Sequence, residues 1–96
     1  MKTRIKKVQE KSKAIKKSYK VVSTWHHGLA ANKVALQHLK KGSPAIKAIV
    51  EGCKQTEKDS GNRSVGLYGW PDRTGRVTLD AAVMKDNQHA GAVAFV

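Results

Sequence analysis

Residues 77–84 show the clearest alternation of hydrophobic and polar positions in the chain. One side carries Val77, Leu79, Ala81 and Val83, and the other carries Thr78, Asp80, Ala82 and Met84. A period of two is typical of a β-strand, whose successive side chains point to opposite faces. The second side turns apolar at its last two members, so the far end of the strand is predicted to be covered on both faces. This pattern favours an inner position in layered α and β structure.

Turn signals surround this strand. Residues 71–75, Pro-Asp-Arg-Thr-Gly, combine a proline that presets φ, an aspartate that bonds its own backbone and a glycine that accepts positive φ. We expect a strand on each side of that turn. Residues 85–88 predict a second hairpin turn, and an uncharged apolar run follows over residues 90–96. Because a free apolar edge promotes aggregation, this run predicts that the chain is a fragment of a larger protein.

Upstream, a short strand is predicted over residues 20–25, ended by Gly28, and two helices follow. The first helix covers residues 29–39 and closes with two lysines and a glycine. Ser43 and Pro44 are predicted to be the N-cap and first residue of the second helix. That helix has an apolar face, Ile46, Ile49, Val50 and Cys53, and a small-residue face, Ala45, Ala48 and Gly52. Glycine costs about 1 kcal/mol in a helix interior, so we expect Gly52 to have a packing role.

The charge of the chain is concentrated at its start. The chain has 96 residues, enough for one small domain, and a net charge of +12. Residues 1–20 hold eight lysines and one arginine against one glutamate. We interpret residues 1–20 as a basic, flexible leader and residues 21–96 as the folding segment. Such a leader can attract nucleic acid or an anionic membrane, but no aromatic platform or RNA-binding signature accompanies it, which favours a solvated leader.

Targeting signals are not evident. The sequence has no apolar run near the ~20 residues that span a bilayer. It also lacks the ~7–15-residue apolar stretch of a secretory signal. The compartment is therefore left open by the sequence, and no membrane span is expected.

Few residues are candidates for chemistry. His26 and His27 are adjacent, so on a strand they point to opposite faces, and no further ligand stands at metal-binding spacing. Neither a metal nor a cofactor is predicted. Cys53 is interpreted as an inert core thiol and Asp80 as a structural carboxylate. The remaining candidates are interpreted as surface or turn residues: His38, His89, Asp59, Asp72 and Asp86.

Two tryptophans need separate interpretation. Trp25 stands where the first predicted strand gives way to a loop, so its ring can pack in the core or lie across a cleft with its N–H available to a ligand. Spacing alone favours the core. Trp70, before the proline turn, is predicted to be a half-buried surface ring. Neither a serine elbow nor a phosphate-binding loop is found.

The order of these motifs resembles the glycosylasparaginase family, the N4-(β-N-acetylglucosaminyl)-L-asparaginases. The similar strings are Ser-Thr-Trp at 23–25, Lys-Gly-Ser-Pro at 41–44 between the helices, AIKAIVEGC at 45–53, and SVG with PDRTGRVTLDAAVM over 64–84. The resemblance covers about residues 21–96. Tyr68 departs from it, since the family usually has glycine there, and Lys85 stands where an acidic residue is common.

The resemblance implies an α+β fold, the N-terminal part of a four-layer αββα sandwich of the N-terminal nucleophile hydrolase type. The implied order is strand-helix-helix-strand-strand-strand. It also implies hydrolysis of a glycosylated asparagine by a threonine that self-cleavage frees and that uses its own α-amino group as base. In the family that threonine follows His-Asp, and none of the five threonines here does. The chain is therefore expected to be inactive without the missing second subunit. Only the tryptophan of the Ser-Thr-Trp string carries over, so Trp25 is expected to line the substrate pocket.

Two alternatives stay open. An isoaspartyl peptidase or plant-type asparaginase of the same superfamily would be expected to open with His-Gly-Gly, whereas this chain has Ser-Thr-Trp. A small basic module that binds nucleic acid through residues 1–20 is the other alternative, and salt-dependent binding to arbitrary DNA would support it.

Overall fold

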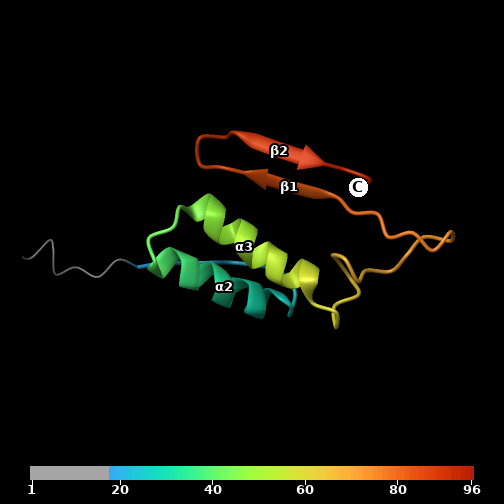
Figure 1. Ribbon diagram of the computed structural model, residues 1–96. Helices are drawn as coiled ribbons and strands as arrows, with labels where there is room; N and C mark the ends of the chain where they lie inside the picture. The colour runs from blue at the N-terminus through green and yellow to red at the C-terminus, as the bar shows by residue number, and fades with distance from the viewer. Residues whose placement is uncertain (1–17) are drawn as a thin grey trace, which may run out of the picture.

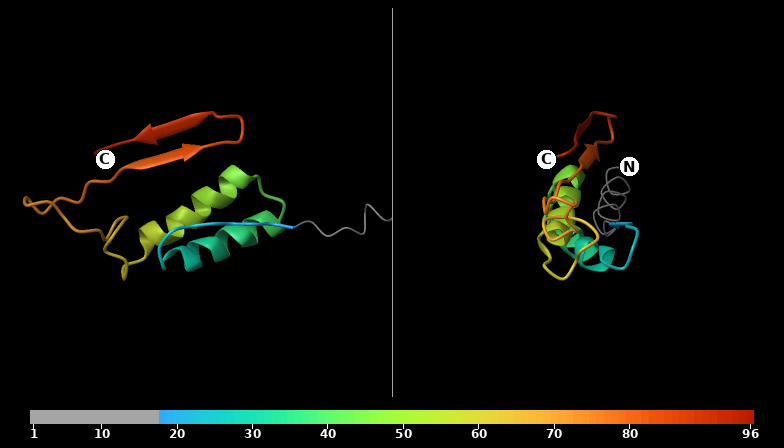
Figure 2. Two further views of the ribbon diagram at one scale, coloured as in Figure 1. Left: turned by 180° about the vertical axis from the view of Figure 1, so that it is seen from behind. Right: turned by 90° about the vertical axis from the view of Figure 1, so that its right-hand side faces the viewer.

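The computed structural model describes residues 18–96 and contains two helices and one β-hairpin. The helices are α2 (Gly28–Lys40) and α3 (Ala45–Lys58), and the strands are β1 (Ala81–Met84) and β2 (Ala90–Val93). Helix α3 lies between α2 on one side and the hairpin on the other, contacting both (Figure 1). The two views of Figure 2 show the same order of layers. The described part is thus α+β, and the predicted leader lies almost wholly outside it.

The two helices pack through small residues. Ala35 of α2 and Ala48 of α3 are 2% and 1% exposed, and Gly52 is also buried. A Cβ atom at Gly52 would lie 2.7 Å from the Ala31 carbonyl oxygen. The backbones therefore approach more closely than a side chain at residue 52 would allow. This contact confirms the predicted packing role of Gly52.

The turn between the helices follows from its glycine. Gly42 has φ of 88°, and its N–H donates to the Leu39 carbonyl at 3.0 Å. The Ser43 N–H donates to the His38 carbonyl, also at 3.0 Å. This pair of bonds is the Schellman pattern that ends a helix on glycine. One detail differs from the prediction: Pro44, not Ser43, is the N-cap of α3, and no side chain caps the helix.

The hairpin is antiparallel, pairing Ala81 with Val93 and Met84 with Ala90. Beyond the strands, Leu79 and Val96 exchange two backbone hydrogen bonds of 2.8 and 3.0 Å. This pair is one residue out of register, and Phe95 is left-handed with φ of 58°. The Phe95 N–H donates to the Asp80 carboxylate at 2.9 Å. The local geometry is a β-bulge held by Asp80, which confirms its structural interpretation.

The other predicted strands are not formed. In the part of the chain that the structure describes, residues 20–25 run irregularly beside the helices and no strand precedes residue 71. The strand predicted over residues 77–84 is formed only from Ala81 to Met84, as β1. A strand requires a partner for its backbone N–H and C=O groups, and only the two segments of the hairpin pair within residues 18–96. No helix in this range has the length and apolar character needed to cross a membrane.

Candidate functional site

The candidate site is the segment that leads into α2, where the chain turns sharply at Trp25. The Trp25 backbone is left-handed, with φ of 67°. Its carbonyl accepts a hydrogen bond from the Gly28 N–H at 3.1 Å, and the His26 carbonyl accepts one from Leu29 at 3.2 Å. The left-handed region costs an L-residue about 1–2 kcal/mol, and residues held there cluster at functional sites.

The Trp25 side chain lies on the surface. It is 79% exposed, so the core packing that spacing favoured is wrong. The helix pair is instead packed through small residues, Ala35, Ala48 and Gly52. An exposed ring on a backbone with restricted freedom can stack on a ligand while its N–H donates a hydrogen bond. The expectation that Trp25 lines a substrate pocket stays a prediction.

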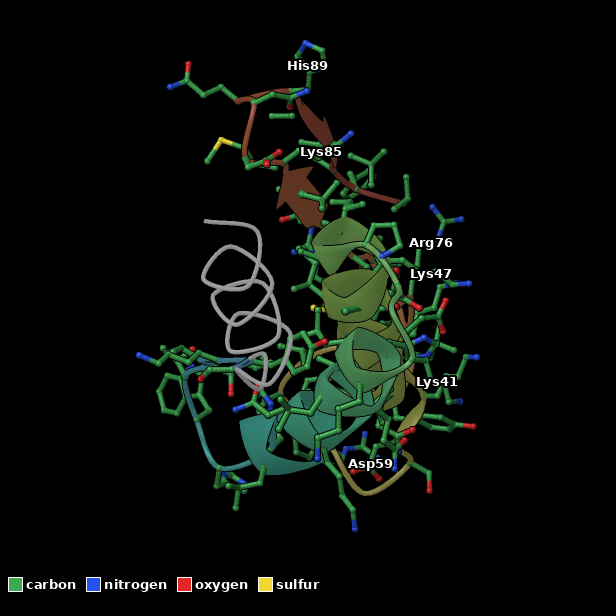
Figure 3. The ribbon with its side chains drawn as sticks, turned by 90° about the vertical axis from the view of Figure 1, so that its left-hand side faces the viewer. Lys41, Lys47, Asp59, Arg76, Lys85 and His89 are labelled. Atoms are coloured by element: carbon green, nitrogen blue, oxygen red, sulfur yellow. The ribbon has the colours of Figure 1, made fainter. Side chains whose placement is uncertain are left out.

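The histidines do not form a metal site in the described residues. The rings of His26 and His27 meet edge to face with centroids 5.7 Å apart. Within residues 18–96 no group of three His, Cys, Asp or Glu side chains is placed to hold a metal ion. His38 lies in the last turn of α2. Figure 3 shows His89 at the tip of the hairpin, pointing away from the helices.

The loop after α3 is docked onto that helix by Gly66. Gly66 has φ of 82°, and a Cβ atom there would lie 2.5 Å from the Cα atom of Glu57. The next N–H, of Leu67, donates to the Glu57 carbonyl at 3.0 Å. The carboxamide oxygen of buried Asn62 accepts the Ser64 N–H at 2.9 Å. The glycine of the Ser-Val-Gly string is therefore required both by conformation and by space.

Trp70 is more exposed than predicted. Its side chain is 74% exposed, whereas a half-buried ring was expected. The Arg63 guanidinium lies over the ring at 4.3 Å from its centroid, which is a cation–π contact. The arginine thus covers part of the indole, and most of the Trp70 side chain is exposed to solvent.

The predicted turn over residues 71–75 is confirmed. The Asp72 carboxylate accepts the Thr74 hydroxyl at 2.6 Å and the N–H groups of Thr74 and Arg76 at 2.8 and 3.1 Å. These bonds, the Thr74 hydroxyl first, lower the pKa of Asp72 because they favour its charged form. Gly75 is left-handed, with φ of 85°. Asp72 is thus occupied in the turn and is not free for acid–base chemistry.

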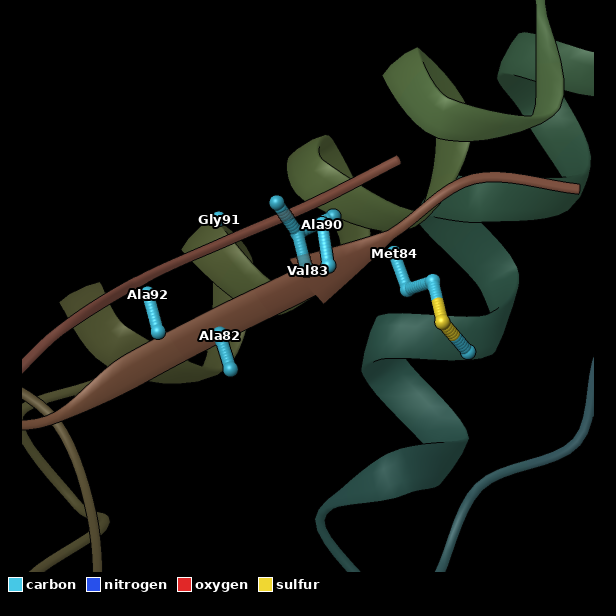
Figure 4. A pocket seen from close by; sticks show the side chains of 6 residues that line it. All are labelled: Ala82, Val83, Met84, Ala90, Gly91 and Ala92. Carbon is cyan, nitrogen blue, oxygen red and sulfur yellow. The ribbon is translucent and has the colours of Figure 1, made fainter. Parts of the chain in front are cut away.

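An apolar groove of about 680 Å³ separates α3 from the hairpin. Its walls include Ile49, Val50 and Cys53 from the helix and Val83 and Val93 from the strands. Figure 4 shows a separate pocket that is lined by the hairpin alone, with small side chains and Met84. Cys53 is exposed in the groove, so its interpretation as a core thiol is wrong. The helix does turn its apolar face toward the sheet, but the two surfaces do not close on each other.

The sequence analysis did not identify the contact that shapes the start of α2. A Cβ atom at Gly28 would collide with the Ser23 side chain, lying 2.7 Å from its Cβ atom and closer still to its Oγ atom. The only signal in the sequence is a glycine three residues after the Ser-Thr-Trp string, which the pattern indicated as a strand breaker.

Comparison with known proteins places these features in a family. A family model described as Asparaginase matches residues 5–96. The N(4)-(β-N-acetylglucosaminyl)-L-asparaginase of Elizabethkingia miricola is 50% identical over 74 residues, which is 77% of this chain and 22% of that protein. The rat protein of the same name is 39% identical over 64 residues, 67% of this chain and 18% of its own length.

A relative with a different name is also similar. A probable isoaspartyl peptidase/L-asparaginase of Arabidopsis thaliana is 41% identical over 75 residues, 77% of this chain and 21% of that protein. The chain thus spans about a fifth of the length of the curated relatives that it matches. The family has the N-terminal nucleophile hydrolase fold, and the helix pair with its hairpin is compatible with an α+β part of it. On the strength of the match over residues 5–96, the chain belongs to the asparaginase family.

Proposed function

We propose that this chain forms the front part of an amidohydrolase that cleaves the bond between N-acetylglucosamine and asparagine. The observation that carries the proposal is the 50% identity over 74 residues with a relative named for that reaction. The strings Ser-Thr-Trp and PDRTGRVTLDAAVM lie at turns that the structure shows to be locally determined, at Trp25 and at Asp72. This stretch is therefore expected to keep the same shape in a complete enzyme.

In that enzyme, the chemical step belongs to residues that this chain does not supply. None of its threonines follows His-Asp. Thr56 is buried in α3, and the Thr74 hydroxyl is bound to Asp72. A threonine with a free α-amino group, on a second subunit, would attack the side-chain amide carbon, and water would then release aspartate. We expect the purified chain by itself to hydrolyse neither a glycosylated asparagine nor asparagine.

Trp25 is the residue of this chain that we propose to contact substrate. Its exposed ring sits on a left-handed backbone, and the Trp25 carbonyl is bound by the Gly28 N–H in the first turn of α2. A backbone with restricted freedom lowers the entropic cost of binding, because less backbone motion is lost when the ligand arrives. The sugar or the aspartyl group would lie against the indole, with the indole N–H as a hydrogen-bond donor.

The second candidate is an isoaspartyl peptidase or L-asparaginase activity, which the name of the Arabidopsis relative supports. A chimera distinguishes the two. The segment of the Elizabethkingia enzyme that matches this chain is replaced by the corresponding segment of this chain. Hydrolysis of N4-(β-N-acetylglucosaminyl)-L-asparagine and of a β-aspartyl dipeptide is then compared. We expect the glycosylated substrate to be preferred; preference for the dipeptide would favour the second candidate.

Variants of the chimera test Trp25 with a matched control. If the stacked ring contributes ~1.4 kcal/mol of binding free energy, Trp25→Ala should raise KM about tenfold. Trp70→Ala removes an equally exposed ring, 74% against 79%, that has no proposed contact with substrate. The KM of the chimera that carries Trp70→Ala should therefore stay unchanged. Equal kinetic effects of the two variants would contradict a role for Trp25 in the pocket.

A further inference from the structure

Gly28 is buried at the first residue of α2, and its missing side chain leaves space that Ser23 fills. Leaving aside its chain neighbours and the backbone of its own helix, the three atoms nearest to a Cβ atom built at Gly28 all belong to Ser23: the Oγ atom, the Cβ atom at 2.7 Å and the carbonyl carbon at 3.9 Å. The segment before the helix therefore folds back directly onto the helix start.

Conformation does not require a glycine at this position. Gly28 is helical and lacks the positive φ of Gly42, Gly66 and Gly75. Alanine is also the better helix former by about 1 kcal/mol in a helix interior, so helix propensity does not favour glycine either. Space for Ser23 is the remaining physical reason for a glycine at residue 28.

This close approach lies next to Trp25 in the chain. Ser23 is pressed against Gly28 from one side, and the Gly28 N–H donates to the Trp25 carbonyl at 3.1 Å. Only Thr24 and Trp25 itself separate Ser23 from the Trp25 carbonyl that the Gly28 N–H binds. The left-handed φ of 67° at Trp25 lies within this short segment.

We propose that Gly28 is a positioning residue for Trp25, because its missing side chain leaves the space in which Ser23 lies. It does not touch substrate. Its role is to admit Ser23 and so to keep the Trp25 backbone left-handed, which directs the ring away from the helix pair. The inference rests on the proposed pocket role of Trp25 only for its effect on catalysis; the effect on the Trp25 backbone stands independently of it.

The structural test uses the full chain labelled for NMR. A left-handed residue gives a strong cross-peak between its own amide proton and Hα, because positive φ brings these atoms together. Gly28→Ala should remove this cross-peak for Trp25 while α3 and the hairpin keep their chemical shifts. The double variant Ser23→Gly with Gly28→Ala should restore it, since the atoms that collide with the new methyl group are gone. Ser23→Gly alone should leave it in place.

Gly91→Ala is the matched control, because a Cβ atom at Gly91 meets nothing within 4 Å. This variant should leave the Trp25 cross-peak unchanged. An unchanged Trp25 cross-peak in Gly28→Ala would overturn the proposal. Loss of the cross-peak in Gly28→Ala that the double variant fails to restore would also overturn it. The same holds if Gly28→Ala loses its helical circular dichroism and the double variant does not recover the cross-peak. Rescue by the second substitution separates positioning through Ser23 from any general effect on the helix.

The catalytic consequence is measured in the chimera described above. Gly28→Ala should raise KM by about the factor found for Trp25→Ala, tenfold for a ~1.4 kcal/mol loss, and the double variant should return KM toward the parent value. If the cross-peak responds as stated while KM is unaffected by either Trp25→Ala or Gly28→Ala, the positioning role stands and the pocket role of Trp25 fails. If Trp25→Ala raises KM and Gly28→Ala does not, the positioning role fails.

Discussion

The close approach of the two helices gives a prediction with a definite sign. Gly52→Ala would place a Cβ atom 2.7 Å from the Ala31 carbonyl oxygen and 3.4 Å from the Ala35 Cβ atom. The first distance is far inside van der Waals contact, and the atom it meets belongs to the backbone of α2. The helices must therefore move apart along the interface where Ala35 and Ala48 are almost fully buried.

The expected magnitude combines two opposing effects. Overpacking a well-packed interface costs roughly 1–3 kcal/mol. Replacing glycine by alanine inside a helix gains about 1 kcal/mol in intrinsic propensity. The net expectation is a loss of about 1 kcal/mol in the free energy of unfolding, where propensity alone would give a gain of the same size.

Urea unfolding of the full chain, followed by circular dichroism at 222 nm, measures this difference. Gly91→Ala again serves as a control, because that position is open. The midpoint should fall for Gly52→Ala without a change of slope, since the slope reports the surface exposed on unfolding. A midpoint that rises for Gly52→Ala would refute the close helix contact.

Three further predictions concern the loops and turns. Gly66→Ala should destabilise the chain more than Gly75→Ala. Both glycines have positive φ, which is worth about 1–2 kcal/mol of strain, but only at Gly66 would the new Cβ atom also lie 2.5 Å from the backbone of α3. Urea unfolding compares the two variants. The Thr74 hydroxyl and nearby N–H groups lower the pKa of Asp72. The contribution of Asp72 to stability is therefore present above its unfolded pKa and is lost as pH falls through the lower folded pKa. A carboxyl 13C titration that finds an ordinary or raised pKa would contradict these hydrogen bonds. Trp25→Gly should be more stable than Trp25→Ala by about 1 kcal/mol, since glycine takes a φ of 67° without strain; equal midpoints would argue against a left-handed Trp25.

Local patterns predicted most of the elements correctly. The lysines and Gly42 marked the end of α2, and the proline turn and the final hairpin follow from residues that set their own backbone. These features depend on neighbours within a few positions, so a sequence carries them directly. The resemblance to the glycosylasparaginases likewise depended on residue order, and the family match confirms it.

The errors concern contacts between distant segments. The β-branched residues at 20–25 fit a strand, yet no segment of residues 18–96 pairs with them. Cys53 lies on the apolar face of α3, but the hairpin stands off from that face and leaves the thiol exposed. Spacing alone favoured the core for Trp25, although the resemblance placed it in a pocket, because the close approach of the helices at Gly52 could not be read from the spacing. Each error thus comes from a pattern that specifies a preferred face but not the partner that covers it.

The decisive experiment for the proposed function is turnover of N4-(β-N-acetylglucosaminyl)-L-asparagine by the chimera that carries this segment. We expect release of aspartate with kcat/KM within about tenfold of the parent enzyme, a transition-state difference of ~1.4 kcal/mol. A chimera that shows the parent's circular dichroism and melting temperature but releases no aspartate would contradict it.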